Sequence, residues 1–299
     1  MAKGSVRLAT ICPVPRRSAQ RLLCLVLVVL GCQACFSSVA RRAADDRPAL
    51  GLSHYQLLAP PISLGENVRN ASGITFHSPS GHLFLVLNQP ERILELNPQG
   101  GVQRSIELSG FEDTEGIAWL RDDLFAVIEE RRRRLVLFEL TPQTRSVTYE
   151  DCCRYQVDGE EAGNRGLEGL SWDAAHRSFY LAKEKKPRCL YRIAMAAVGE
   201  PSLAVEIPWD VQRDSCGLDD LSDLYHSAAT QSLLLLSDES RCVVEVDERG
   251  RELSRLWLER GEAGLEQDIP QPEGLTCDDS GRLYVCSEPN LLYVFGRKM

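Results

Sequence analysis

The sequence predicts an all-β fold, a five-bladed β-propeller built from four-stranded blades. The first observation is a tripeptide that recurs five times: Ser72-Gly73-Ile74, Glu115-Gly116-Ile117, Glu168-Gly169-Leu170, Ser222-Asp223-Leu224 and Glu273-Gly274-Leu275. The second is an acidic or amide residue 14 to 16 positions after each tripeptide: Asn88, Glu129, Glu184, Asp238 and Glu288. The tripeptides lie 43 to 54 residues apart, a spacing typical of propeller blades rather than of helical repeats.

Each repeat reads as four short strands separated by turn residues. In the first repeat we expect strands at residues 73–77, 83–88, 92–97 and 102–108, which are rich in branched and aromatic side chains. The second strand of each repeat is apolar on both faces, as expected where neighbouring blades cover both sides of a sheet. The fifth repeat lacks an outer strand, and the segment His54–Leu58 precedes the first repeat. We therefore expect His54–Leu58 to complete the last blade and close the ring.

Composition is consistent with one soluble propeller domain over residues 54–299. The 299-residue chain is 43% hydrophobic and 26% charged, which is ordinary for a globular protein. Its formal net charge of -9 argues against a nucleic-acid partner, because tracking phosphates requires clustered Lys and Arg. We expect a monomer.

The first 32 residues resemble an export signal. Basic residues precede the apolar segment Leu22–Gly31, which is too short for an ordinary membrane span. Val29-Leu30-Gly31-Cys32 resembles a bacterial lipoprotein cleavage site, with Cys32 as the lipid-modified residue and residues 33–53 as a tether. A plain signal peptide cut near Ala34 or Ala40, or an uncleaved anchor, remains an alternative. We expect an exported, periplasmic protein, which the lipid or an uncleaved anchor would tether to the cell membrane or the outer membrane.

Seven of the eleven cysteines lie in the predicted propeller. Their spacing matches no zinc motif, so a structural metal cluster is not expected. Because disulfides are common in exported proteins, we expect one or two of them, for example from Cys152 or Cys153 to Cys189. The remaining cysteines would be small buried apolar residues.

The acidic residues of the repeats predict a metal site. In each blade the second strand runs antiparallel to the innermost strand. The start of the innermost strand and the end of the second strand therefore lie at the same rim of the channel. Eight carboxylates would meet there: Glu115, Glu129, Glu168, Glu184, Asp223, Asp238, Glu273 and Glu288. Converging carboxylates raise one another's pKa or bind a cation, and an oxygen-rich site suits Ca²⁺ better than Zn²⁺. We therefore predict calcium at the channel mouth.

Two other interpretations of these acids remain open. They could form ordinary salt bridges with Lys183, Lys185, Arg165 and Arg241, although these partners do not repeat whereas the acids do. They could also bind a positively charged ligand. The five histidines lie at turns and strand ends and indicate no catalytic or zinc site.

The repeat motifs resemble those of the SdiA-regulated, or YjiK-like, family of bacterial proteins. The resemblance lies in Phe111-Glu-Asp-Thr-Glu-Gly-Ile117, Asn164-Arg-Gly-Leu-Glu-Gly-Leu170, Leu236-Ser-Asp-Glu-Ser240 and Gln271-Pro-Glu-Gly-Leu275, and it covers residues 54–296. Membership would imply a five-bladed propeller distantly similar to NHL-repeat proteins, an export or membrane segment, and a bound calcium ion. It implies no known activity. Asn88 and Gln89 stand where the family commonly has an acidic pair.

Three functions follow as hypotheses. We favour a non-enzymatic module that binds an unidentified protein or small molecule on its loop face, with calcium stabilising the mouth. The alternative is a calcium-dependent hydrolase, by analogy with lactonase propellers, in which Glu129 or Glu168 activates water. A periplasmic scaffold without an ion is the third, and it would disperse the acids over the surface.

Overall fold

The computed structural model describes residues 49–157, 166–185, 188–195, 205–206 and 216–298. The chain divides into two units, Met1–Arg47 and Pro48–Met299, and all described residues belong to the second. The predicted export segment, Cys32 and most of the predicted tether therefore lie outside the described residues. Within the part that is described, no helix has the length and apolar character needed to cross a membrane.

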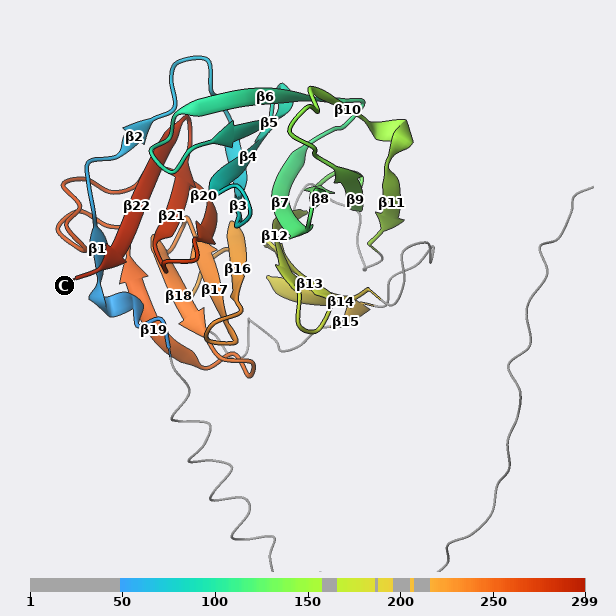
Figure 1. Ribbon diagram of the computed structural model, residues 1–299. Coiled ribbons are helices and arrows are strands. Elements are labelled where there is room, and N and C mark those ends of the chain that lie inside the picture. Colours follow the sequence, from blue (N-terminus) through green and yellow to red (C-terminus); the bar gives the residue numbers. More distant parts are fainter. Residues whose placement is uncertain (1–48, 158–165, 186–187, 196–204, 207–215, 299) are drawn as a thin grey trace, which may run out of the picture. The chain divides into compact units, whose positions relative to one another are not determined.

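Five small sheets form a ring, which is the arrangement of a five-bladed propeller (Figure 1). The first blade contains β3 (Ala71–His77), β4 (His82–Asn88), β5 (Glu91–Leu96), β6 (Val102–Ser109) and β10 (Ser146–Thr148). The second contains β7 (Thr114–Arg121), β8 (Leu124–Glu129), β9 (Arg134–Glu139) and β11 (Cys153–Gln156). The third contains β12 (Leu167–Asp173), β13 (Ser178–Lys183), β14 (Cys189–Ala194) and β15 (Val205–Glu206).

The last two blades complete the ring. The fourth contains β16 (Asp223–Ser227), β17 (Ser232–Ser237), β18 (Cys242–Val246) and β19 (Glu252–Trp257). The fifth contains β20 (Pro272–Cys277), β21 (Leu283–Ser287), β22 (Leu291–Arg297), β1 (Tyr55–Leu57) and β2 (Ile62–Ser63). Of two short 3₁₀ helices, η1 (Leu52–His54) precedes β1, and η2 (Tyr149–Asp151) lies between β10 and β11. Each innermost strand contacts the next, from β3 through β7, β12, β16 and β20 back to β3.

The closure predicted for His54–Leu58 is confirmed. Strand β1 pairs antiparallel with β22, with Tyr55 opposite Arg297 and Leu57 opposite Phe295. The start and the end of the propeller thus share one sheet, which leaves no open edge between the first and last blades. Strand β10 was not predicted. It pairs in parallel with β6, where buried Val147 joins the apolar layer between the first two blades.

The core lies between the blades. Five apolar clusters are present, and each one combines side chains from two neighbouring blades. A strand in the middle of a blade is therefore covered on both faces, and all six residues of β17 are buried. This is the physical reason that the second strand of each repeat is apolar throughout rather than alternating.

The propeller extends a few residues ahead of its predicted start at His54. Leu52 is fully buried, and the backbone N–H groups of Leu50 and Gly51 donate to the carboxylate of Glu245, over 2.8 and 3.1 Å. Glu245 itself is fully buried in the fourth blade, and Ser232 and Ser254 also donate to it. Residues 50–52 therefore stabilise the blade and give a buried carboxylate its hydrogen bonds.

The disulfide prediction was wrong for the described cysteines. Cys152, Cys153 and Cys189 are all free thiols, as are the other four cysteines of the propeller. Cys189 opens β14 and is buried in the apolar cluster between the second and third blades. Burial raises the pKa of Cys242 to about 12. The buried cysteines serve as small apolar side chains, the role predicted for those outside a disulfide.

Candidate functional site

Glycines bring the innermost strands unusually close together at one end of the channel. A Cβ atom placed on Gly116 would lie 2.8 Å from the backbone O of Glu168 and 2.8 Å from the backbone N of Leu170. Gly73 meets the following blade at 2.6 to 2.9 Å in the same way. Only a residue without a side chain allows this approach. The residue before each glycine therefore projects into a crowded rim, and in three blades that residue is a glutamate.

In the fourth blade, Asp223 stands where the other blades have glycine. Its carboxylate is buried, and it accepts hydrogen bonds from the backbone N–H groups of Leu224 (2.7 Å) and Leu275 (2.8 Å). Burial raises the pKa of Asp223 well above its usual range, whereas these N–H groups lower it. Asp223 thus links two neighbouring inner strands, and its oxygen atoms already have partners. This differs from the ligand role that the repeat pattern predicted for it.

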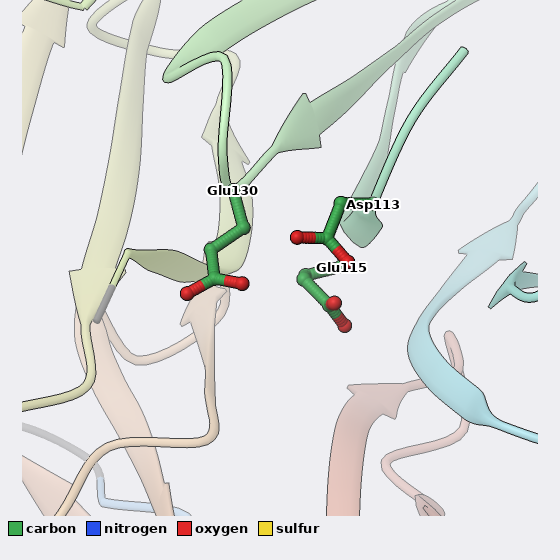
Figure 2. A group of neighbouring side chains, drawn as sticks. All are labelled: Asp113, Glu115 and Glu130. Carbon is green, nitrogen blue, oxygen red and sulfur yellow. The ribbon is translucent and has the colours of Figure 1, made fainter. Parts of the chain in front are cut away.

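Three carboxylates come together at the second blade, at the start of β7 and the end of β8. Asp113, Glu115 and Glu130 each offer an oxygen atom, and these atoms all lie within 4.8 Å of one another. Figure 2 shows Asp113 and Glu115 side by side, with Glu130 approaching from the adjacent strand. The backbone fixes this arrangement, because the N–H of Glu130 donates to the carbonyl of Asp113 over 2.9 Å.

Asn88 extends the three-carboxylate group toward the first blade. Its Nδ2 donates to Oε1 of Glu115 over 2.8 Å. Its Oδ1 is buried and, in the described part of the structure, accepts no hydrogen bond. An unpaired buried carbonyl oxygen beside a carboxylate is a free ligand atom for a cation. Arg131 supplies a counter-charge at the outer side, with its Nε 2.9 Å from Oδ2 of Asp113.

Burial and mutual repulsion raise the pKa values of the rim glutamates. The pKa of Glu115 rises to about 7 through burial and the charges of Asp113 and Glu130, against the opposing hydrogen bonds from Asn88 and Ser72. The pKa of Glu273 rises to about 8 through burial and then the charges of Asp238, Glu288, Glu115 and Asp220.

Glu168 joins these groups into one network across the mouth. Burial raises its pKa well above the usual range, and the charges of Glu115, Glu130, Glu184 and Glu273 raise it further. Carboxylates from the second, third and fifth blades therefore repel one another at short range. A cation bound among them would relieve this repulsion.

Among the described residues, salt bridges account for some of the acids but not for the glutamates of the inner strands. Lys185 lies 2.7 Å from a carboxylate oxygen of Glu184 and 2.7 Å from one of Glu239. Arg241 pairs instead with Asp268 over 2.8 Å. The ordinary salt-bridge interpretation therefore applies to Glu184. Of the other proposed partners, Lys183 donates to the backbone carbonyl of Lys185, and Arg165 lies outside the described residues.

Glu129 does not belong to the three-carboxylate group. Glu129, the residue before Glu130, is fully buried. Its Oε1 accepts hydrogen bonds from the backbone N–H of Glu112 (2.9 Å) and from Arg132 (3.0 Å). In this blade Glu130 occupies the position that Asn88, Glu184 and Glu288 have in theirs. Its backbone N–H donates to the carbonyl of Asp113, two residues before Glu115. The same bond is made by Asn88 to Asn70, by Glu184 to Gly166 and by Glu288 to Gln271.

The sequence held a signal for Glu130. Glu130 follows Glu115 by 15 residues, within the 15 to 16 found in the other blades, whereas Glu129 follows it by 14. Asp113 had no such signal, because it precedes the repeated tripeptide and the residue at that position varies between blades. Asp238 and Glu288 directly follow the last residues of β17 and β21, and burial raises the pKa of each.

An apolar layer lies directly beneath the acids. One residue from each inner strand contributes to it, and each of the five is at most 3% exposed: Ile74, Ile117, Leu170, Leu224 and Leu275. Each of these residues directly follows the glycine of its inner strand, or Asp223 in the fourth blade. The apolar layer therefore lies between the acidic mouth and the remainder of the inner strands.

Comparison with known proteins identifies the same architecture. The sequence model of a family described as SdiA-regulated matches residues 49–296. A calcium-binding protein, regucalcin from Agrobacterium tumefaciens, is 14% identical with a TM-score of 0.50, covering 80% of this chain and 94% of that one. A chain of a nidogen/laminin complex is 13% identical with a TM-score of 0.50, covering 74% of this chain and 73% of that one. At these identities the two solved structures show the fold alone.

Proposed function

We propose, starting from the chain's membership of the SdiA-regulated family, that it is a calcium-binding propeller whose ion completes a ligand- or protein-binding surface at the channel mouth. One observation carries the proposal. Asp113, Glu115 and Glu130 converge within 4.8 Å, and the buried Oδ1 of neighbouring Asn88 lacks a hydrogen-bond donor in the described structure.

This donor set fits Ca²⁺ in chemistry and in size. Calcium takes oxygen ligands at about 2.4 Å, so two ligands of one ion are at most about 5 Å apart. The three carboxylates meet that limit. All the donors are hard oxygen atoms, which suit calcium and exclude a preference for zinc. In this proposal Asp113, Glu115, Glu130 and Asn88 hold the ion, and Glu168 is a further carboxylate whose pKa the charges of Glu115 and Glu130 raise.

The bound ion would stabilise a rim that otherwise repels itself. Two positive charges among the glutamates favour their ionised forms, which burial alone disfavours. The loop of residues 259–272 joins the fourth blade to β20 and shares this face with the acids. A ligand or partner protein would then contact the loops and the calcium-organised rim together. The regucalcin neighbour is described as calcium-binding, but the proposal rests on the donor atoms of this chain.

Calorimetric titration of the purified full-length protein with CaCl₂ tests the calcium proposal. We expect saturable binding that is weakened by roughly tenfold or more in Glu115→Gln and in Glu130→Gln, because each substitution removes one ionised ligand. Glu139→Gln is the matched control, since Glu139 is an exposed acid at the end of β9 in the same blade. Absence of saturable heat in the wild type, or unchanged affinity in both site variants, would contradict the proposal.

A hydrolase remains the second candidate, and the raised pKa of Glu168 is the observation that favours it. A carboxylate whose pKa is raised above its ordinary value is a stronger general base, which suits the activation of water in this mechanism. Glu129, the other candidate, has one oxygen bound to Arg132 and to a backbone N–H. A screen of lactones and esters with added calcium distinguishes the two functions. Turnover that is lost in Glu168→Gln while calcium affinity is retained would favour the enzyme.

The proposal also places the propeller outside the cytoplasm, tethered through its N-terminus. Its support is the export-like segment Leu22–Gly31 followed by Cys32, both outside the described residues. Mass spectrometry of the mature N-terminus tests it. A lipid-modified Cys32 would support the tether. A mature chain that begins near Ala34 or Ala40 would indicate a plain signal peptide instead.

A further inference from the structure

A cavity occupies the central channel beyond the apolar layer, toward the face opposite the acids. Its volume is about 180 Å³, and residues from all five inner strands line it. The five residues of the apolar layer form its inner end. The rest of the lining comes from later positions in each strand and from the turns that follow, such as those at Ser78 and Asp279. None of the proposed calcium ligands lines the cavity, so it is separate from the acidic mouth.

Aromatic side chains from four blades line this cavity: Phe76, Trp119, Trp172 and Tyr225. The first three occupy the same position, three residues after the glycine of their inner strands. All four are half-buried, so part of each side chain packs between blades and part remains accessible. Aromatic surface around a small cavity favours a ligand that can itself pack as a ring, edge-on or offset.

The two tryptophans are held in place by their surroundings. Trp119 meets the ring of His77 edge-on, with centroids 5.1 Å apart, and its Nε1 donates to the carbonyl of Asp122 over 2.9 Å. The Trp172 ring packs against Phe179, with centroids 4.6 Å apart. The walls of the cavity therefore exist before any ligand arrives, which reduces the entropy lost on binding.

Three hydroxyl groups of the lining have a hydrogen atom left to donate. Thr75, Ser171 and Thr276 each accept a backbone N–H from the next inner strand around the ring, over 3.2, 2.9 and 3.2 Å. A hydroxyl group can donate as well as accept, and none of these three donates to a described residue. They are available to an oxygen atom of a ligand.

The lining does not suit an anion. Among its described residues there is no Lys or Arg, and Asp279 is the only carboxylate. Asp279 is exposed and accepts a hydrogen bond from the hydroxyl of Ser78. Burial keeps the other titratable groups uncharged near neutral pH, because it lowers the pKa of His226 and raises the pKa values of Tyr225 and Cys277. A negative charge in this cavity would have no partner, which is costly.

We infer that this cavity binds a small neutral aromatic molecule, a single ring that carries an oxygen substituent. An apolar protein cavity of about 150 Å³ holds one benzene molecule, so the volume here suits one ring with a small substituent. The ring would pack against the aromatic walls and the apolar layer. Its oxygen would accept a hydrogen bond from one of the three hydroxyl groups.

NMR of the tryptophan indole N–H groups in the full-length protein tests this inference. The chain has four tryptophans, so the signals of Trp119 and Trp172 can be assigned from their loss in Trp119→Phe and Trp172→Phe. Benzyl alcohol is the probe. We expect saturable shifts of both signals, whereas the signal of Trp257, which is 41% exposed outside the cavity, should stay in place.

Three probes of similar size separate the possible ligand classes. Cyclohexylmethanol keeps the hydroxyl group but has a saturated ring, and it should bind about threefold more weakly or less tightly still, because the aromatic contacts are lost. Sodium benzoate is an anion and benzylammonium chloride supplies a cation. Each should bind about tenfold more weakly than benzyl alcohol, since its charge must lose water without a free partner.

Variants at the cavity mouth locate the bound molecule. Ala228 is exposed and lines the cavity, whereas the next residue, Ala229, is exposed and does not. Ala228→Phe should weaken the binding of benzyl alcohol by about tenfold or more by filling the mouth, and Ala229→Phe is the matched control. Ala174→Phe, with Ala175→Phe as its control, repeats the test in the third blade should the first variant fold poorly.

Three results would overturn the inference. Benzyl alcohol could fail to produce saturable shifts of the Trp119 and Trp172 signals. One of the other three probes could bind as tightly as benzyl alcohol, which would assign the cavity to a saturated, anionic or cationic ligand. The affinity could also stay unchanged in both Ala228→Phe and Ala174→Phe, which would place the bound molecule elsewhere.

Discussion

The acidic rim should make the calcium-free protein less stable as the pH rises. The pKa of Glu273 is about 8 in the folded protein, against an ordinary value of 4.5. Below pH 4.5 the carboxyl is protonated in both the folded and the unfolded chain. Between these two values the folded protein holds a proton that the unfolded chain has released, so stability falls with pH. Above pH 8 that loss is complete.

The size of the effect follows from the shift. One group titrating in this way lowers the free energy of unfolding by about 1.4 kcal/mol per pH unit, and the full shift corresponds to about 5 kcal/mol. Glu273→Gln removes the titrating group, but the amide that replaces the carboxyl group is also buried. The cost of burying the amide offsets part of the gain in stability. We therefore expect the variant to be about 3 kcal/mol more stable than the wild type at pH 8.5, and to have a shallower pH dependence.

Urea unfolding at pH 5, 7 and 8.5 with a calcium chelator measures both quantities. Glu139→Gln, at an exposed position, should stay within about 0.5 kcal/mol of the wild type at each pH. The reasoning is refuted if the wild type is equally stable at pH 5 and pH 8.5 without calcium. It is also refuted if Glu273→Gln destabilises the protein equally at all three values.

Three further outcomes follow from the packing. Gly116→Ala should lower stability by about 2 kcal/mol, seen as a melting temperature several degrees lower, because the new Cβ would lie 2.8 Å from the Glu168 carbonyl. Asp223→Asn should cost about 2 kcal/mol in urea unfolding, since an amide nitrogen cannot accept one of the two backbone hydrogen bonds; unchanged stability would contradict this. Alkylation mapped by mass spectrometry should modify exposed Cys153 in the native protein and leave buried Cys286 intact until unfolding.

The repeat determined most of the fold in advance. A blade must bury both faces of its middle strands, so uniformly apolar strands at a regular spacing leave few alternatives. The unpaired segment His54–Leu58 then indicated closure, because the last blade lacked its outer strand. Strand β10 was missed since its three residues, Ser146–Thr148, are too few to show a period. The disulfide prediction relied on the expected compartment alone, and the packing of Cys189 against its neighbours could not be read from spacing.

The repeat pattern indicates the rim on which the acids lie, whereas the particular side chains that meet there depend on strand register. Successive residues of a strand point to opposite sides, so a shift of one position exchanges a rim side chain for a buried one. That shift separates Glu130, in the three-carboxylate group, from Glu129, which binds Arg132. Asp223 shows a different limit. The repeat pattern placed it at the rim, but its backbone hydrogen bonds depend on two strands distant in sequence, which spacing alone cannot reveal.

Backbone strain and charge repulsion coincide at the channel mouth. Asn70, Asp113 and Gln271 have φ values of 52°, 56° and 39°, a region that residues other than glycine seldom adopt, and each stands two positions before the rim residue of its blade. Asp113 combines this strain with a carboxylate of the proposed ion site. Such a cost is retained where the surrounding structure enforces it and function uses it. A ligand at the rim would offset the charge repulsion, and a divalent cation bound there would do so directly.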